Sequence, residues 1–98
     1  MKTTTYYILI NIKTADSFVS IGKFFIGNNR RLADKLFNKL KGSSEVNEKT
    51  MLAMEFMETA DGLPLNLQII SCSLGELAAN CRIITKETFK AINLEELL

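Results

Sequence analysis

The segment of residues 50–93 constrains the fold more than any other part of the chain, because it predicts a β-hairpin that leads directly into a capped helix. Within residues 50–59 and 65–72, large apolar side chains recur at every second position, which is typical of strands with one face in the core. Asp61 and Gly62 lie between these two runs and supply the positive φ angle that a tight hairpin turn requires. The segment is therefore expected to contribute two neighbouring antiparallel strands.

Alternate positions of this hairpin are expected to face the core: Leu52, Met54 and Phe56 on the first strand, and Leu65, Leu67 and Ile69 on the second. Directly after the hairpin, Ser73 and Glu76 have the spacing of a capping box, in which each side chain bonds the other residue's backbone N–H. The helix that follows has an apolar stripe at helical spacing, made of Leu77, Ala78, Cys81, Ile84, Phe89 and Ile92.

One further strand is predicted over residues 3–12. Its even positions form one apolar face, and its odd positions form the other face, with Thr5, Tyr7, Leu9 and Asn11. Residues 13–20 are expected to form a connecting loop. Residues 21–27 are ambiguous between a buried loop and a short helical turn, because two glycines interrupt any long regular element there.

A first helix is predicted over residues 30–41, where apolar residues recur at helical spacing. Asn28 or Asn29 is expected to cap its N-terminus, because an asparagine side chain accepts a hydrogen bond from a backbone N–H that has no partner within the helix. Gly42 follows at the position where glycine commonly ends a helix. The stripe expected to face the core is Leu32, Ala33, Leu36, Phe37 and Leu40.

These elements predict a single α+β domain over residues 1–98 in the order β-α-β-β-α. A crossover from the first strand followed by a tight hairpin favours a three-stranded antiparallel sheet, in which the third strand lies between the first and the second. Both helices are expected on one face of this sheet. The arrangement is similar to the ferredoxin-like plan without its last strand, which is an analogy of fold and implies no function.

The other face of such a sheet has no helix to cover it, and its predicted side chains are unusually apolar. Five of them are expected to expose on the order of 300–600 Å², which is the patch size that marks an interaction site. The chain is therefore predicted to form a homodimer through this face. The residues assigned to self-association are Tyr7, Leu9, Met57, Ile70 and Cys72.

The composition argues against several classes of function. The 98 residues are 47% hydrophobic with a net charge of +1, so the chain can bury a core and has no global attraction to nucleic acid or acidic membranes. It contains no histidine, which removes the usual general base at neutral pH and the usual metal ligand. We therefore predict that the protein is not an enzyme and has no catalytic residue, cofactor or metal site.

The location of the protein is predicted from its termini and cysteines. No apolar run is long enough to span a bilayer, and the N-terminal residues lack the small-residue cleavage site of a signal peptide. Two cysteines without an export signal favour a reducing compartment. A cytoplasmic protein without a membrane partner is therefore expected.

A basic segment offers the first candidate binding site. Six lysine and arginine residues lie between positions 23 and 41, opposed by Asp34 alone. Backbone N–H groups and the helix dipole attract anions to the N-terminus of a helix. The residues assigned to this anion-binding site are Lys23, Asn28, Arg30 and Arg31. The alternative explanation is an ordinary solvated helix face.

Three other features have a chemical and a structural explanation. Cys72 precedes the last helix, whose N-terminus lowers the pKa of a nearby thiol, but without a histidine as base we favour a semi-buried structural thiol. The apolar run that includes Phe18, Phe24 and Phe25 would line a small-molecule pocket or, as we expect, close one end of the core. Residues 94–98 match the LxxLL pattern of docking helices, and a frayed end or a dimer contact explains them equally well.

The function predicted from the sequence is that of a small non-catalytic interaction module that binds a second copy of itself. The alternative is a module that binds an anion, a nucleotide or RNA through the basic N-terminus of the first helix. Nucleic acid is the less expected partner, because no basic residues accompany the aromatic residues of the first strand.

Overall fold

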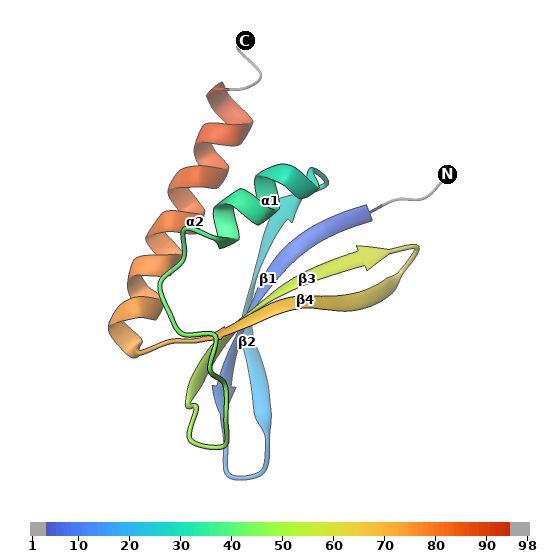
Figure 1. Cartoon of the computed structure of the whole chain (residues 1–98). Coiled ribbons are helices and arrows are strands. Elements are labelled where there is room, and N and C mark those ends of the chain that lie inside the picture. The colour runs from blue at the N-terminus through green and yellow to red at the C-terminus, as the bar shows by residue number, and fades with distance from the viewer. Residues whose placement is uncertain (1–3, 95–98) are drawn as a thin grey trace.

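The computed structural model describes residues 4–94 and shows a single small α+β domain, in which two helices lie against an antiparallel sheet (Figure 1). The elements, in chain order, are β1 (Thr4–Lys13), β2 (Phe18–Gly27), α1 (Arg30–Phe37), β3 (Leu52–Ala60), β4 (Leu63–Ser71) and α2 (Leu74–Leu94). Neither of the helices described here combines the length and the hydropathy needed to cross a membrane. The LxxLL pattern of residues 94–98 extends outside the described residues.

The sheet has four strands in the order β2-β1-β3-β4, and each neighbouring pair is antiparallel. The predicted three-stranded sheet is therefore wrong. The predicted strand order is also wrong, because β3 and not β4 pairs with β1. The chain forms two hairpins that meet along β1 and β3, and α1 connects them, so the similarity to the ferredoxin-like plan does not hold.

The strand missing from the prediction is β2, whose residues are predicted above as a loop and an ambiguous segment. Two register shifts in its ladder with β1, one between Tyr6 and Tyr7 and one between Ile10 and Asn11, interrupt the alternation of side chains along β2. Gly22 also lacks a side chain, and a Cβ there would stand 3.3 Å from Cδ1 of Ile10. A pattern of strict alternation therefore does not identify this edge strand.

The hairpin of β3 and β4 forms as predicted. Asp61 and Gly62 make its turn with φ angles of 53° and 82°, the left-handed region that a two-residue hairpin turn uses. Pro64 is the second residue of β4, which is an edge strand and therefore tolerates a residue without an N–H.

A bulge in β4 decides which of its residues face the core. Leu67 is the extra residue between two consecutive pairs of the ladder, and it packs against the core as predicted. Beyond it the alternation shifts by one, so that Ile70 is buried in the core and Ile69 lies on the opposite face. The orientations predicted for these two isoleucines are therefore wrong. Leu65 is 54% exposed, so its predicted place in the core is wrong as well.

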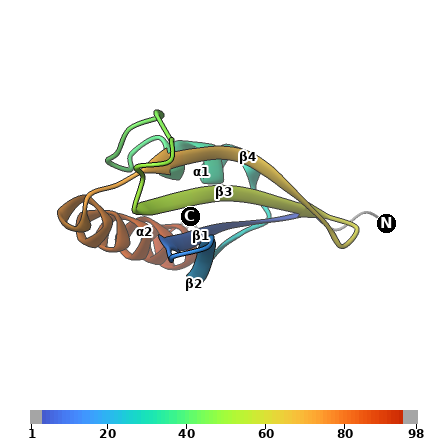
Figure 2. The same cartoon turned by 90° about the horizontal axis from the view of Figure 1, so that it is seen from below.

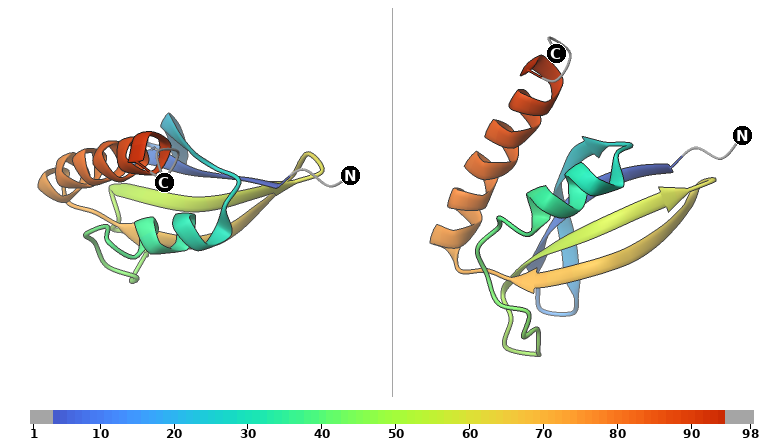
Figure 3. Two further views of the ribbon diagram at one scale, coloured as in Figure 1. Left: turned by 90° about the horizontal axis from the view of Figure 1, so that it is seen from above. Right: turned by 45° about the horizontal axis from the view of Figure 1, so that its top comes forward.

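Both helices lie on the same face of the sheet, as predicted. In Figure 2 β3 and β4 pass in front of α1, and in the left panel of Figure 3 α1 passes in front of them. Phe37 of α1 stacks on Phe56 of β3 with 5.2 Å between the ring centroids. The buried core consists of Tyr6, Ile8, Ile10, Ala33, Leu36, Phe37, Met54, Phe56, Ile70 and Ile84.

The apolar run of β2 divides between the core and the surface. Phe24 and Ile26 pack against the core, which agrees with the expectation that this run closes one end of it. Phe18 and Phe25 are exposed, so the expectation is wrong for them. The division follows from the strand itself, because neighbouring residues of a strand point to opposite faces of the sheet.

α1 is shorter than predicted. Asn29 is the N-cap, because its Oδ1 accepts a hydrogen bond from the N–H of Leu32 at 3.1 Å. The helix ends at Phe37. Gly42 does not end the helix and instead allows a close approach to the end of β4, since a Cβ at this position would stand 2.6 Å from the carbonyl oxygen of Ser71.

α2 begins with the predicted capping box. The N–H of Ser73 donates to Oε1 of Glu76 at 2.9 Å, and the N–H of Glu76 donates to Oγ of Ser73 at 3.1 Å. The last turns of α2 project beyond the sheet (Figures 1 and 3). Phe89 and Ile92, which are predicted as core residues, are therefore exposed.

A buried asparagine joins α2 to the segment that follows α1. Asn80 is fully buried, and its amide forms two hydrogen bonds of 2.7 Å with the backbone of Lys41. The N–H of Lys41 donates to Oδ1, and Nδ2 donates to the carbonyl oxygen of Lys41. The bonds hold the connection after α1 against the first half of α2.

Candidate functional site

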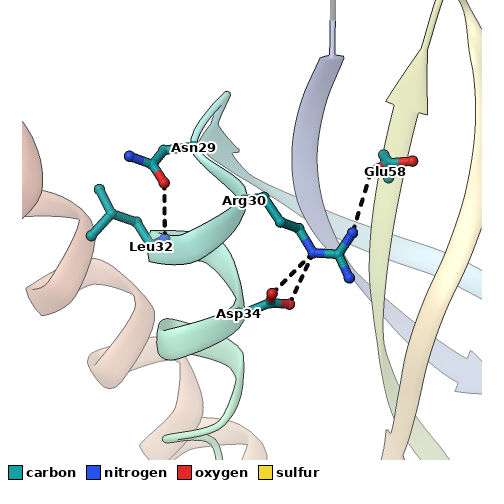
Figure 4. Close-up of polar contacts among 5 residues, drawn as sticks. All are labelled: Asn29, Arg30, Leu32, Asp34 and Glu58. Carbon is teal, nitrogen blue, oxygen red and sulfur yellow. Dashed lines mark hydrogen bonds and ion pairs between the residues drawn. The ribbon is translucent and has the colours of Figure 1, made fainter.

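The guanidinium group at the centre of the predicted anion-binding site already has partners. Nε of Arg30 lies 3.0 Å from Oδ2 of Asp34, and Nη1 of Arg30 lies 3.6 Å from Oε1 of Glu58 on β3 (Figure 4). The same guanidinium lies 5.9 Å from the ring centroid of Tyr6. These contacts attach the N-terminus of α1 to the sheet, and they oppose the binding of a further anion by Arg30.

The other residues of the predicted anion-binding site lie apart. Lys23 is on the face of the sheet opposite α1. Asn28 and Arg31 are exposed, and the capping position belongs to Asn29 rather than Asn28. The structure therefore does not bring Lys23 together with the two arginines.

Tyr6 forms the buried side of the cluster around Arg30. Burial raises the pKa of its hydroxyl, and the carboxylate of Glu58 raises it further, while Arg30 acts in the opposite direction. A tyrosine with a raised pKa stays protonated at neutral pH. The cluster is thus better suited to fastening α1 to β1 and β3 than to acid–base chemistry.

Cys72 lies just after β4 and packs against the core, on the helix-covered side of the sheet. Its thiol lies 3.5 Å from the carbonyl oxygen of Lys41. Burial raises the pKa of the thiol, and the carboxylate of Glu76 raises it further. The position agrees with the semi-buried structural thiol that we favour from the sequence.

The face of the sheet opposite the helices is an ordered grid of side chains, which we call the open face. Three rows cross the four strands from β2 to β4, and the register of the sheet determines their members. The rows are Phe25, Tyr7, Met57 and Asn66; Lys23, Leu9, Glu55 and Ile69; and Ser20, Asn11, Ala53 and Ser71. In the part of the chain that the structure describes, no helix lies over this grid (Figure 2).

A chain of hydrogen bonds crosses the open face and connects all four strands. Oγ of Ser20 on β2 donates to Oδ1 of Asn11 on β1 at 2.6 Å. Nδ2 of Asn11 donates to Oε1 of Glu55 on β3. Nδ2 of Asn66 on β4 donates to the other oxygen of that carboxylate at 2.6 Å. These bonds hold the charge of Glu55 at the centre of the face.

Apolar side chains flank this polar chain. Phe25 and Ile21 of β2 are 62% and 58% exposed. Tyr7, the neighbour of Phe25, is nearly covered, and Nζ of Lys23 lies 4.2 Å from its ring centroid. The open face thus combines an apolar contact surface with one cation, Lys23, and one anion, Glu55.

The open face contains three of the five residues predicted for self-association, namely Tyr7, Leu9 and Met57. Ile70 and Cys72 lie on the other side of the sheet, because of the bulge in β4 and the end of that strand, so their predicted place on this face is wrong. Phe25 and Ile21 are missing from the prediction together with β2. The signal that identifies them is the short segment of residues 14–17 between two apolar runs, which is the length of a hairpin loop.

Neither a cluster of metal-ligating side chains nor a similarity to known proteins assigns a function to this chain. Within residues 4–94, no group of three carboxylate, thiol or imidazole side chains is placed to hold a metal ion. No protein-family model, no curated protein and no solved structure matches the chain.

Proposed function

We propose that this chain is a small non-catalytic interaction module that associates with a second copy of itself through the open face. The observation that carries the proposal is the exposure of Phe25 and Ile21, beside further apolar side chains, on a face that none of the described helices covers. Large exposed apolar patches on a folded domain mark interaction sites.

The size of the open face suits a contact between two copies. Four strands that lie about 4.8 Å apart and are about 30 Å long present a footprint of about 600 Å². A specific interface of standard size buries about 800 Å² on each partner. The open face and the side chains at its rim therefore come close to the area that a stable dimer needs.

The charges of the open face favour a symmetric pair. Lys23 and Glu55 lie in the same row, one on each side of Leu9. In a dimer with two-fold symmetry, if residue i of one copy contacts residue j of the other, then j of the first copy also contacts i of the second. An axis parallel to β1 and above Leu9 places Lys23 of each copy against Glu55 of the other, so that the two charges are complementary across the interface.

Sedimentation equilibrium of the wild type and of two matched double variants tests this proposal. Phe25→Ser/Ile21→Ser removes exposed apolar surface from the open face, and Phe89→Ser/Ile92→Ser removes a similarly exposed pair from α2. Loss of Phe25 removes about 100 Å² from each copy, which is worth about 2.5 kcal/mol per copy. We expect the dissociation constant to rise at least about 100-fold for the open-face variant and to change little for the α2 variant.

Two results would contradict the proposal. A wild-type protein that stays monomeric at high micromolar concentration rules out self-association as its role. Weakening of the dimer by the α2 variant, with no effect of the open-face variant, assigns the interface to the helix layer.

The alternative function, a module that binds an anion, a nucleotide or RNA, has less support because Arg30 is already paired with two carboxylates. It predicts an affinity for a nucleotide or RNA that falls with salt, since phosphate contacts release counterions. It also predicts that the Arg30→Ala/Arg31→Ala variant loses this affinity. Equal binding by the wild type and the variant excludes the N-terminus of α1 as the site.

A further inference from the structure

The two charges of the open face lie in one row, on either side of β1. Lys23 is on β2 and Glu55 is on β3, and Leu9 of β1 lies between them. Neighbouring strands of a sheet are about 4.8 Å apart, so the backbones at the two charged positions are about 10 Å apart. The row therefore has a cation on one flank and an anion on the other.

Neither charge has an ionic partner within its own chain. Among the described residues, no carboxylate lies within ion-pair distance of Lys23, and no lysine or arginine lies within that distance of Glu55. In the helix layer, by contrast, Nζ of Lys39 lies 2.6 Å from Oε1 of Glu87. Both charges of the open face are thus available to groups of opposite charge on a partner.

The open face also restricts where these two charges lie. The carboxylate oxygens of Glu55 accept hydrogen bonds from Nδ2 of Asn11 and Nδ2 of Asn66. Nζ of Lys23 lies over the ring of Tyr7, 4.2 Å from its centroid. Groups that are already ordered lose less conformational entropy when they pair with a partner.

The positions of the charges discriminate between possible two-fold axes of a face-to-face dimer. An axis along β2 places Lys23 against Lys23 of the other copy, and an axis along β3 places Glu55 against Glu55. An axis along the row, perpendicular to the strands, opposes like charges at both positions. An axis along β1 opposes unlike charges, and the symmetry repeats that contact, so two ion pairs form.

We propose that Lys23 and Glu55 determine the specificity of the dimer, because they admit a second copy only when it is related by an axis along β1. The specificity rests on the proposed function, since it requires the open face to be the interface. Such an axis aligns the strands of the two sheets, which is a common arrangement of packed sheets. It also places Leu9 against Leu9 and Phe25 against Met57 of the other copy, so apolar contacts accompany the ion pairs.

Charge reversal tests this specificity by sedimentation equilibrium. Lys23→Glu opposes two carboxylates at both contacts, and Glu55→Lys opposes two ammonium groups. We expect each variant alone to have a dissociation constant at least about 100-fold above that of the wild type. An equimolar mixture of the two variants restores both attractive contacts, and its dissociation constant is expected to lie within about tenfold of the wild-type value.

Two further variants complete the test. Lys23→Glu/Glu55→Gln removes the repulsion and keeps an oxygen at position 55 that accepts a hydrogen bond, so it remains informative even if Glu55→Lys does not fold. We expect it to dimerise at least about tenfold more tightly than Lys23→Glu. Lys86→Glu is the matched control, because Lys86 is an exposed lysine of α2, and its reversal is expected to leave the dissociation constant unchanged.

Three results would overturn the proposed specificity: a dimer that Lys23→Glu leaves unchanged, a mixture of the reversed variants no tighter than either alone, or equal weakening by Lys23→Glu and Lys86→Glu. If Phe25→Ser/Ile21→Ser still weakens the dimer in these cases, the open face is the interface and only the axis is wrong. A monomeric wild type contradicts the proposed function and the specificity together, so the two failures are distinguishable.

Discussion

Asn80 is expected to contribute more to stability than any other polar side chain of the helix layer. It is fully buried, and its amide makes two hydrogen bonds of 2.7 Å to the backbone of Lys41. Asn80→Ala removes both bonds, at about 1 kcal/mol each. It also leaves the N–H of Lys41 without a partner and its carbonyl oxygen with only the weak thiol contact of Cys72, at about 1–2 kcal/mol more. We therefore expect a loss of about 3–4 kcal/mol, out of about 5–15 kcal/mol for a domain of this size.

Asn80→Asp separates hydrogen bonding from side-chain volume. The aspartate still accepts a bond from the N–H of Lys41 but has no donor for its carbonyl oxygen, and it adds a buried negative charge. Burial raises the pKa of a carboxyl group above its unfolded value of about 3.9. Because the folded-state pKa is the higher one, protonation stabilises the folded variant, and its deficit relative to the wild type shrinks as the pH falls toward about 4.

Urea unfolding followed by circular dichroism, between about pH 4 and pH 7, measures both variants. Asn93→Asp is the matched control on α2, because Asn93 is exposed and its amide donates to the carbonyl oxygen of Phe89 in its own helix. Its effect is expected to stay within about 0.5 kcal/mol. A loss below about 1 kcal/mol for Asn80→Ala, or a deficit of Asn80→Asp that does not change with pH, would refute the reasoning.

Two further predictions concern the chain near the end of β4. Gly42→Ala is expected to lower the free energy of unfolding by about 1–3 kcal/mol, because the added Cβ would stand 2.6 Å from the carbonyl oxygen of Ser71. Gly75→Ala is its control, since no atom lies within 4 Å of the added Cβ, and urea unfolding is expected to show a gain of up to about 1 kcal/mol. Cys72 is expected to react with iodoacetamide more slowly at neutral pH in the folded protein than in urea, because burial raises the pKa of the folded thiol. Peptide mass spectrometry separates its labelling from that of Cys81, and a folded-state titration midpoint below the unfolded one would instead indicate an activated thiol.

Elements that depend on nearby residues were predictable from the sequence. The turn at Asp61 and Gly62 and the capping box of Ser73 and Glu76 form as expected, because each involves residues at most three positions apart. The apolar side of β1 was predictable for a similar reason, since Tyr6, Ile8 and Ile10 all face the core and no register shift interrupts the ladder of β1 with β3. The alternation along β2 is interrupted by register shifts, so the same rule fails there.

The candidate sites were less predictable than the elements. The open face was expected, but one extra residue in β4 exchanges Ile69 and Ile70 between the two sides of the sheet. A run of basic residues suggested a candidate anion-binding site, and the structure pairs Arg30 of that run with acidic residues.

The sequence by itself determined the turn, the helix caps and the α+β character of this protein, because those depend on backbone conformations and hydrogen bonds between close neighbours in the chain. Only the tertiary structure decided the strand order, the inward orientation of Ile70 and the partners of Arg30. These features depend on contacts between segments far apart in sequence, such as the pairing of β1 with β3. That pairing competes with other strand registers that satisfy the local sequence pattern about equally well. The same long-range contacts bring Phe25 beside Tyr7 on the open face.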